Sequence, residues 1–168
     1  KDDELAAKLR LTYKTVGACL SAMDSWLVIR GVKTLALRME QHQKNAIALA
    51  EWLKTQPKVT KVLFPGLLEH PGYEVNKAQT TGFGGMLSFE VDSEETAKKV
   101  LEGIELIQFA ESLGGTESLL TYPVTQTHPD LKPEDAERKG ITRRLLRLSV
   151  GIEDTDDLIA DLAQAFNK

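Results

Sequence analysis

The sequence predicts an α/β or α+β domain, in which a small, mainly antiparallel sheet carries helices on one face and follows a long helix. Three observations support this prediction. Apolar residues recur at helical spacing through the first part of the chain, short β-type runs alternate with short amphipathic segments in the rest, and Gly and Pro residues separate them. The 168 residues are 42% hydrophobic and 27% charged, enough to bury a substantial core. This order of elements favours helices packed on a sheet.

The first part of the chain is expected to be helical. Apolar residues recur irregularly over residues 5–20, where Gly17 weakens the pattern. A long helix is predicted over residues 23–55, with one face formed by Trp26, Ile29, Val32, Leu35, Met39, Ala46, Leu49 and Leu53. We therefore predict N-terminal helices over residues 1–56 and a small C-terminal domain over residues 57–168.

The remaining elements are short. The predicted strands are residues 61–64, 86–91, 107–113 and 145–150. Helices are predicted near residues 74–79, after a Ser93 cap to about residue 102, around residues 134–138, and after an Asp154 cap. A polar loop with three prolines fills residues 121–142. The segments are too closely spaced for a linker that would split this part of the chain.

Arg147 is the most informative single residue. Side chains alternate along residues 145–150, so Leu146 and Leu148 face the core and Arg147 lies on the other face. If that face is covered, the guanidinium needs a partner, and a carboxylate fits it bidentately. A solvated arginine on an open face is the alternative that composition alone favours. Ser112 presents a hydroxyl to a cleft or belongs to an ordinary turn, and the residues alone favour neither.

Composition argues against several functions. The net charge of −4 and the lack of a basic run argue against nucleic-acid or anionic-membrane partners. No apolar stretch is long enough to cross a membrane, and the three histidines lack metal-ligand spacing. The single cysteine, Cys19, excludes a disulfide within the chain and fits a reducing, cytoplasmic location. Because the chain begins with Lys1 rather than Met, we expect its natural start to be missing.

Two stretches carry a resemblance to a known family. AESLGGTESL, residues 110–119, and LLRLSVGIED, residues 145–154, resemble signature stretches of the Cys/Met-metabolism pyridoxal-phosphate (PLP) enzymes. That family includes cystathionine γ-synthases, cystathionine β- and γ-lyases and methionine γ-lyases. Further matches occur in the family's order at residues 24–35, 38–40, 82–89 and 127–128. The resemblance implies the C-terminal domain of a fold-type I PLP enzyme, with residues 24–35 in its interdomain helix.

The resemblance also implies roles for three residues. Arg147 is similar to the arginine that binds the substrate's α-carboxylate, and Ser112 is similar to the serine beside it. Thr121 stands where γ-acting members often have an acidic residue, and it is the third predicted substrate-binding residue. The strand pattern around Arg147 agrees with its implied role.

The family's catalytic lysine has no counterpart in this sequence. It lies in a Ser-x-x-Lys-type segment upstream of the matched region, and Lys98 falls instead on an amphipathic helix. That lysine is both nucleophile and acid–base group. We therefore expect no catalytic residue in this chain, PLP bound mainly by a missing upstream domain, and no activity of the fragment alone. Members are typically tetramers, so a homotetramer is expected for the longer protein.

The Thr121 departure favours one reaction within the family. The run from Thr121 to His128 resembles bacterial cystathionine β-lyase and γ-synthase-like sequences. We favour C–S β-elimination, which converts the small-molecule substrate cystathionine into homocysteine, pyruvate and ammonia. A γ-synthase or γ-lyase is the alternative within the family. An amino-acid-binding regulatory module, or an oligomerisation module without catalysis, is the alternative of another class, although the long helix is oversized for a compact sensor.

Overall fold

A computed structural model describes residues 2–168 of the chain. The chain divides into two compact units, one ending at Ala36 and the other comprising Leu37–Lys168. No helix within the described residues is long and apolar enough to cross a membrane. The two units differ in how they use their apolar residues.

The first unit contains helices α1 (Asp3–Val16) and α2 (Ala22–Val32). The Asp2 carboxylate caps α1 by accepting a hydrogen bond from the Leu5 backbone N–H at 3.0 Å. Gly17 ends this helix in the left-handed region, with φ of 67°, which glycine adopts without a Cβ penalty. Neither helix has a buried residue.

The helix predicted over residues 23–55 is two helices, because a turn at Lys33 and Thr34 separates α2 from α3 (Leu35–Lys54). The Thr34 backbone N–H and hydroxyl both donate to the Gly31 carbonyl oxygen, at 3.3 and 3.4 Å. This bond spans three residues rather than four, so the backbone tightens and the regular helix stops. The prediction of helix was right for most of these residues, and the prediction of one continuous helix was wrong.

The second unit is built on a five-stranded sheet in the order β1-β2-β5-β4-β3. Its strands are β1 (Val59–Leu63), β2 (Met86–Val91), β3 (Gln108–Phe109), β4 (Leu119–Thr121) and β5 (Leu145–Ser149). Only the edge pair β3–β4 is parallel, and the other three pairs are antiparallel. The predicted small, mainly antiparallel sheet is confirmed, with β5 at its centre.

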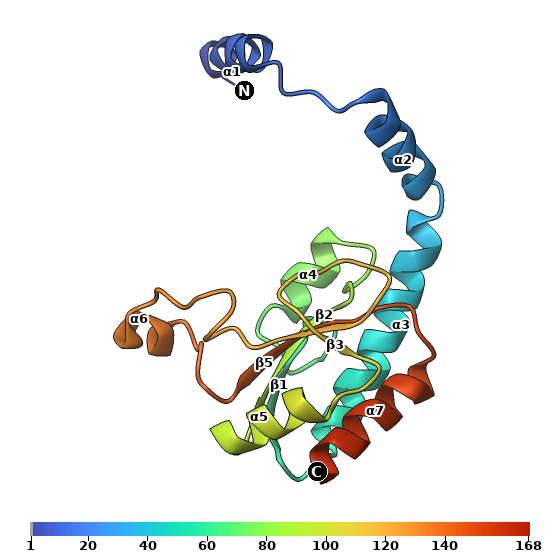
Figure 1. Cartoon of the computed structure of the whole chain (residues 1–168), viewed down its shortest axis with the longest axis vertical. Helices are drawn as coiled ribbons and strands as arrows, with labels where there is room; N and C mark the ends of the chain where they lie inside the picture. Colours follow the sequence, from blue (N-terminus) through green and yellow to red (C-terminus); the bar gives the residue numbers. More distant parts are fainter. Residues whose placement is uncertain (1) are drawn as a thin grey trace. The chain divides into compact units, whose positions relative to one another are not determined.

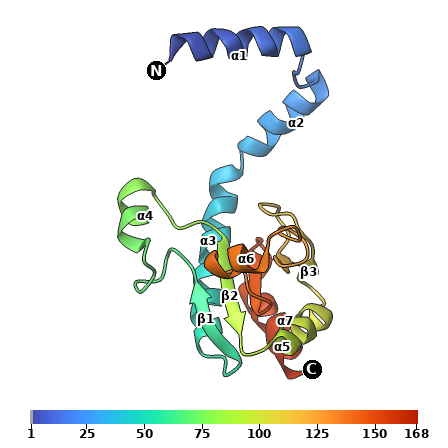
Figure 2. The ribbon, with the colours of Figure 1, turned by 90° about the vertical axis from the view of Figure 1, so that its left-hand side faces the viewer.

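Helices α3, α5 (Glu94–Gly103) and α7 (Thr155–Asn167) cover one face of the sheet. Their apolar faces pack on the core-facing side chains of the central strands, including Leu87, Phe89, Leu146 and Leu148. The other helices are α4 (Tyr73–Gln79) and α6 (Pro133–Arg138), and α6 lies on the side of the sheet away from α3 (Figures 1 and 2). The prediction of helices on one face is therefore confirmed for the helices that form the core.

The sequence misplaces the strands between α5 and α6. The strand predicted over residues 107–113 is only two residues long, and β4 was not predicted. The Asp161 carboxylate of α7 accepts hydrogen bonds from the backbone N–H groups of Glu105, Leu106 and Ile107. A distant side chain thus takes the N–H of Ile107, the first residue of the predicted strand, and β3 begins only at the next residue. All of β4 is buried, so it lacks the alternation that marks a half-exposed strand.

Candidate functional site

Arg147 lies in the central strand β5, between two strands that offer it small polar neighbours. It pairs with Ser88 of β2 on one side and with Thr121 of β4 on the other. Its strand neighbours on the same face, Leu145 and Ser149, are buried, so this face is covered. The Ser149 hydroxyl accepts a hydrogen bond from the Gly114 backbone N–H at 2.9 Å, which ties the covering segment to the strand. This face of the sheet is therefore covered, and the open face that composition alone favoured is not observed.

The guanidinium of Arg147 is only partly satisfied by the protein. Its Nη2 donates to the Glu111 carbonyl oxygen at 2.5 Å and to the Thr121 hydroxyl at 3.2 Å. Its Nε–H is buried and has no hydrogen-bond partner among the described residues. Buried side-chain donors are nearly always paired, so an orphan of this kind calls for an explanation. A ligand with acceptor oxygens would supply the missing partner.

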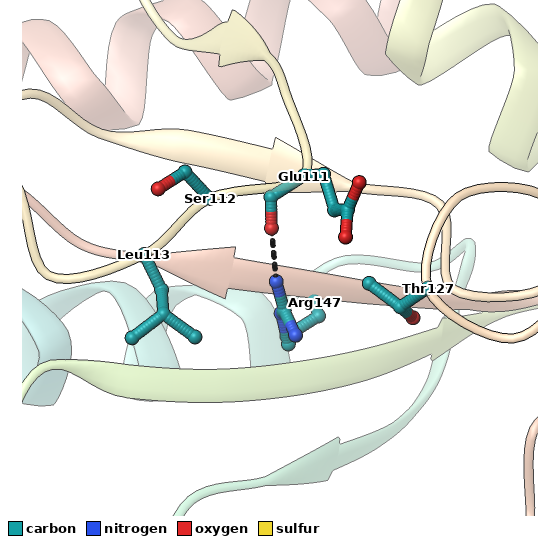
Figure 3. Close-up of a pocket in the computed structure, with 5 residues that line it drawn as sticks. All are labelled: Glu111, Ser112, Leu113, Thr127 and Arg147. Atoms are coloured by element: carbon teal, nitrogen blue, oxygen red, sulfur yellow. Dashed lines mark hydrogen bonds between the residues drawn. The ribbon is translucent and has the colours of Figure 1, made fainter. Parts of the chain in front are cut away.

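An open pocket of about 420 Å³ lies above the guanidinium. Figure 3 shows the carbonyl of Glu111 directed at Arg147, with Leu113 and Thr127 on either side. The pocket is lined by Glu111, Ser112, Leu113, Thr127 and Arg147. The pocket thus offers one guanidinium, one carboxylate, hydroxyl groups and one apolar side chain. Such a set suits a small zwitterionic molecule with an apolar part.

The structure brings together two of the three predicted substrate-binding residues. Arg147 and Ser112 both line the pocket. Thr121 is fully buried and lies beside Arg147 rather than in the pocket lining. Its hydroxyl donates to the Ala110 carbonyl oxygen at 2.7 Å.

Glu111, Leu113 and Thr127 also line the pocket, although the sequence did not single them out. A signal was present, because Glu111 and Leu113 flank Ser112 in the AESLGG stretch and Thr127 belongs to the matched pair Thr127-His128. The predicted strand over residues 107–113 would have placed Glu111 and Leu113 on the face opposite Ser112. In the structure the strand ends at Phe109, and the following loop brings all three to the pocket.

The two signature stretches are joined by a network of hydrogen bonds. The Glu153 carboxylate accepts from the backbone N–H of Ser118 at 2.5 Å and from its hydroxyl at 2.8 Å. The same hydroxyl accepts from the Gly151 backbone N–H at 2.8 Å. These bonds hold the segment after β5 against the segment before β4. Some residues of the signature stretches, namely Ser118, Gly151 and Glu153, thus have a structural role, because they hold the two stretches together.

The lysine considered on sequence grounds lies away from this pocket. Lys98 of α5 forms an ion pair with Glu94 at 2.8 Å, and this carboxylate raises the pKa of Lys98. No lysine lines the pocket of Arg147, and the described residues contain no cluster of side chains able to hold a metal ion. The pocket lining by itself therefore does not fit PLP, which needs a lysine for its aldehyde and several donors for its phosphate. It fits a carboxylate.

The fold and the pocket define a small α/β domain with a carboxylate-sized cationic site on its central strand. The chain belongs to the family of Cys/Met metabolism PLP-dependent enzymes, whose model matches residues 1–167. The resemblance stated from the signature stretches is confirmed, and the fold agrees with it.

Relatives of three activities match almost the whole chain. It is 47% identical over its whole length to a cystathionine β-lyase of Bacillus subtilis, and covers 43% of that protein. It is 51% identical to a cystathionine γ-synthase of Haemophilus influenzae, with 99% of this chain and 41% of that protein covered. A crystal structure of cystathionine γ-lyase from Lactobacillus plantarum, complexed with L-serine, superposes with a TM-score of 0.91 at 40% identity, and covers 99% of this chain and 44% of that one. The chain thus spans less than half the length of these relatives.

Proposed function

We propose that this chain supplies the α-carboxylate site of a PLP-dependent C–S lyase of sulfur amino acid metabolism, of the cystathionine β-lyase type. The observation that carries the proposal is the buried, unpartnered Nε–H of Arg147 beside an open pocket. A substrate carboxylate would accept from this donor and neutralise the guanidinium charge. The cofactor would be held mainly by the part of a longer protein that this chain does not include.

The pocket lining supports an amino acid with charged groups at both ends. Arg147 would hold the α-carboxylate next to the reacting carbon, and the Ser112 hydroxyl would lie beside it. The Glu111 side chain lines the same pocket and would attract a distal ammonium group. Cystathionine carries such a group at its far end. The chain's own task would be to bind and orient this substrate.

Replacing Arg147 in the longer, PLP-loaded enzyme tests the proposal. Arg147→Lys keeps the charge but removes the forked pair of donors, so we expect kcat/KM for cystathionine to fall about 100-fold. Arg144→Lys is the matched control, because Arg144 forms a 3.5 Å ion pair with Glu90 and does not line the pocket. An Arg147→Lys enzyme that retains the activity of the Arg144→Lys enzyme would rule out the carboxylate site.

The γ-synthase type is a second candidate, favoured by the 51% identity to the Haemophilus influenzae enzyme. The products formed from cystathionine separate the types. Pyruvate with homocysteine indicates β-cleavage, whereas 2-oxobutyrate with cysteine indicates γ-cleavage and would overturn the β-lyase proposal. Synthesis of cystathionine from cysteine and an activated homoserine would identify a γ-synthase.

We also infer that the 168-residue chain is inactive alone. Incubation with PLP, reduction with borohydride and mass spectrometry would detect any imine, and we expect no stoichiometric adduct at a single lysine. Such an adduct, together with C–S lyase activity, would contradict the inference. The homotetramer and the cytoplasmic location stay predictions. Light scattering on the longer protein tests the former, and cell fractionation tests the latter.

A further inference from the structure

We propose that Thr121 is a positioning residue, which holds the guanidinium of Arg147 in the orientation that receives a carboxylate. This inference rests on the proposed function of Arg147. Thr121 is fully buried and absent from the pocket lining, so it reaches a ligand through Arg147 rather than directly. The two residues are paired across β4 and β5, which fixes the distance between their Cα atoms.

The direction of each hydrogen bond follows from the chemistry of a hydroxyl group. Thr121 has one hydroxyl proton, and it donates this proton to the Ala110 carbonyl oxygen at 2.7 Å. Its oxygen therefore presents lone pairs to Arg147, whose Nη2 donates to it at 3.2 Å. A guanidinium has no acceptor, so Thr121 can only accept from it, and the Ala110 carbonyl keeps the hydroxyl proton directed away from Arg147.

This arrangement fixes one corner of the guanidinium and leaves another available. Nη2 has two protons, and its two acceptors are the Thr121 hydroxyl and the Glu111 carbonyl oxygen. Because the guanidinium is planar, fixing Nη2 also restricts the direction of the Nε–H. That N–H is the buried donor without a partner. Thr121 therefore reduces the rotational freedom that a carboxylate would otherwise have to remove on binding.

The sharpest test compares two ligands that differ only in the carboxylate. L-Alanine and L-alaninamide have the same side chain, and neither has a leaving group on its β-carbon. Their dissociation constants would be measured by calorimetry on the longer, PLP-loaded protein. The quantity of interest is the ratio of the alaninamide constant to the alanine constant, because a general loss of structure weakens both ligands and cancels in this ratio.

Thr121→Val keeps the shape of the side chain and removes the hydroxyl. We expect it to lower the ratio about tenfold, as the loss of one hydrogen bond to a charged group would. Thr121→Ser restores the hydroxyl and should return the ratio to within about twofold of the wild type. Ser88→Ala is the matched control. It removes a hydroxyl from the residue paired with Arg147 on the other side, in β2, which does not line the pocket and is not an acceptor of Arg147.

The result for Arg147→Lys separates the two proposals. If Arg147→Lys leaves the ratio unchanged, the carboxylate site itself is wrong. If Arg147→Lys lowers the ratio and Thr121→Val does not, the carboxylate site stands and the positioning role of Thr121 is wrong. The positioning role is also wrong if Ser88→Ala lowers the ratio as much as Thr121→Val, since any hydroxyl paired with Arg147 across the sheet would then have the same effect.

Discussion

The two units of this chain use the same local helix signals but differ in what they bury. In residues 2–36 no side chain is buried, and Trp26 is 55% exposed. In the second unit α3, α5 and α7 enclose a continuous apolar core with the sheet. Both units have capped helices, with Asp2 at α1 and Ser93 at α5. Caps and spacing therefore specify helices without specifying burial, which depends on whether a second apolar surface is present.

The apolar stripe predicted over residues 23–55 shows this difference within a single sequence pattern. Its first part, including Trp26, Ile29 and Val32, is exposed. Its last part, formed by Ala46, Leu49 and Leu53, is fully buried against the sheet. Helical spacing predicted the buried face correctly where the stripe meets the sheet, whereas no side chain of the first part is buried and its predicted face stays a prediction.

The largest expected effect on stability comes from truncating a leucine to alanine in the second unit, compared with the same truncation in the first. Leu49 is fully buried, whereas Leu27 is 49% exposed. We expect Leu49→Ala to lower the free energy of unfolding by about 2–5 kcal/mol, and Leu27→Ala by less than about 0.5 kcal/mol. Urea unfolding of the 168-residue chain, followed by circular dichroism, measures both. Equal losses would show that the first unit has a core of its own.

The fold was largely predictable, because most of its signals are local. The caps Ser93 and Asp154 begin α5 and α7 as expected, and β2 lies where the alternation of Leu87 and Phe89 placed it. The predicted strand boundaries are wrong where hydrogen bonds to residues distant in sequence determine the local structure. Asp161 is far from residues 105–107 in sequence, so nothing local predicts that its carboxylate binds their N–H groups.

The site was less predictable than the fold. The alternation placed Arg147 on the face opposite Leu146 and Leu148 without showing that this face is covered, and the resemblance gave roles to Ser112 and Thr121. No periodicity could show that the Nε–H of Arg147 would be left without a partner, because this depends on where the Glu111 and Thr121 oxygens lie. The loop that brings Glu111 and Leu113 to the pocket is irregular, so a repeating pattern could not locate it.

A smaller effect is expected from two aspartates that bind backbone N–H groups. Asp161 is buried and accepts three such bonds, whereas Asp2 is exposed and accepts one at 3.0 Å. Replacing Asp161 with Asn removes the charge and one acceptor oxygen, so we expect a loss of about 2–3 kcal/mol. Asp2→Asn should cost less than about 0.5 kcal/mol, because Asn also caps helices well. Urea unfolding measures both, and an unchanged midpoint for Asp161→Asn would contradict the anchoring role.

The smallest expected effect depends on pH and compares two Glu–Lys pairs of the same spacing. The Lys98 ammonium, aided by the Arg143 guanidinium, lowers the pKa of Glu94 below its ordinary value of 4.5, against partial desolvation. A carboxyl group with a lowered pKa in the folded state contributes stability above its unfolded pKa, and this contribution is lost as the pH falls through the folded value. Glu4 pairs with Lys8 at 2.7 Å on α1, which buries nothing.

Thermal melts between neutral and acid pH would reveal the difference between these pairs. Glu94→Gln should melt below the wild type at neutral pH, and the two melting curves should converge in acid once Glu94 is protonated. Glu4→Gln should match the wild type at every pH, because the melt reports the core of the second unit. A gap between wild type and Glu94→Gln that persists in acid would assign its effect to packing rather than charge. A Glu4→Gln gap at neutral pH would mean that α1 unfolds together with that core, and the two units would then be one cooperative structure.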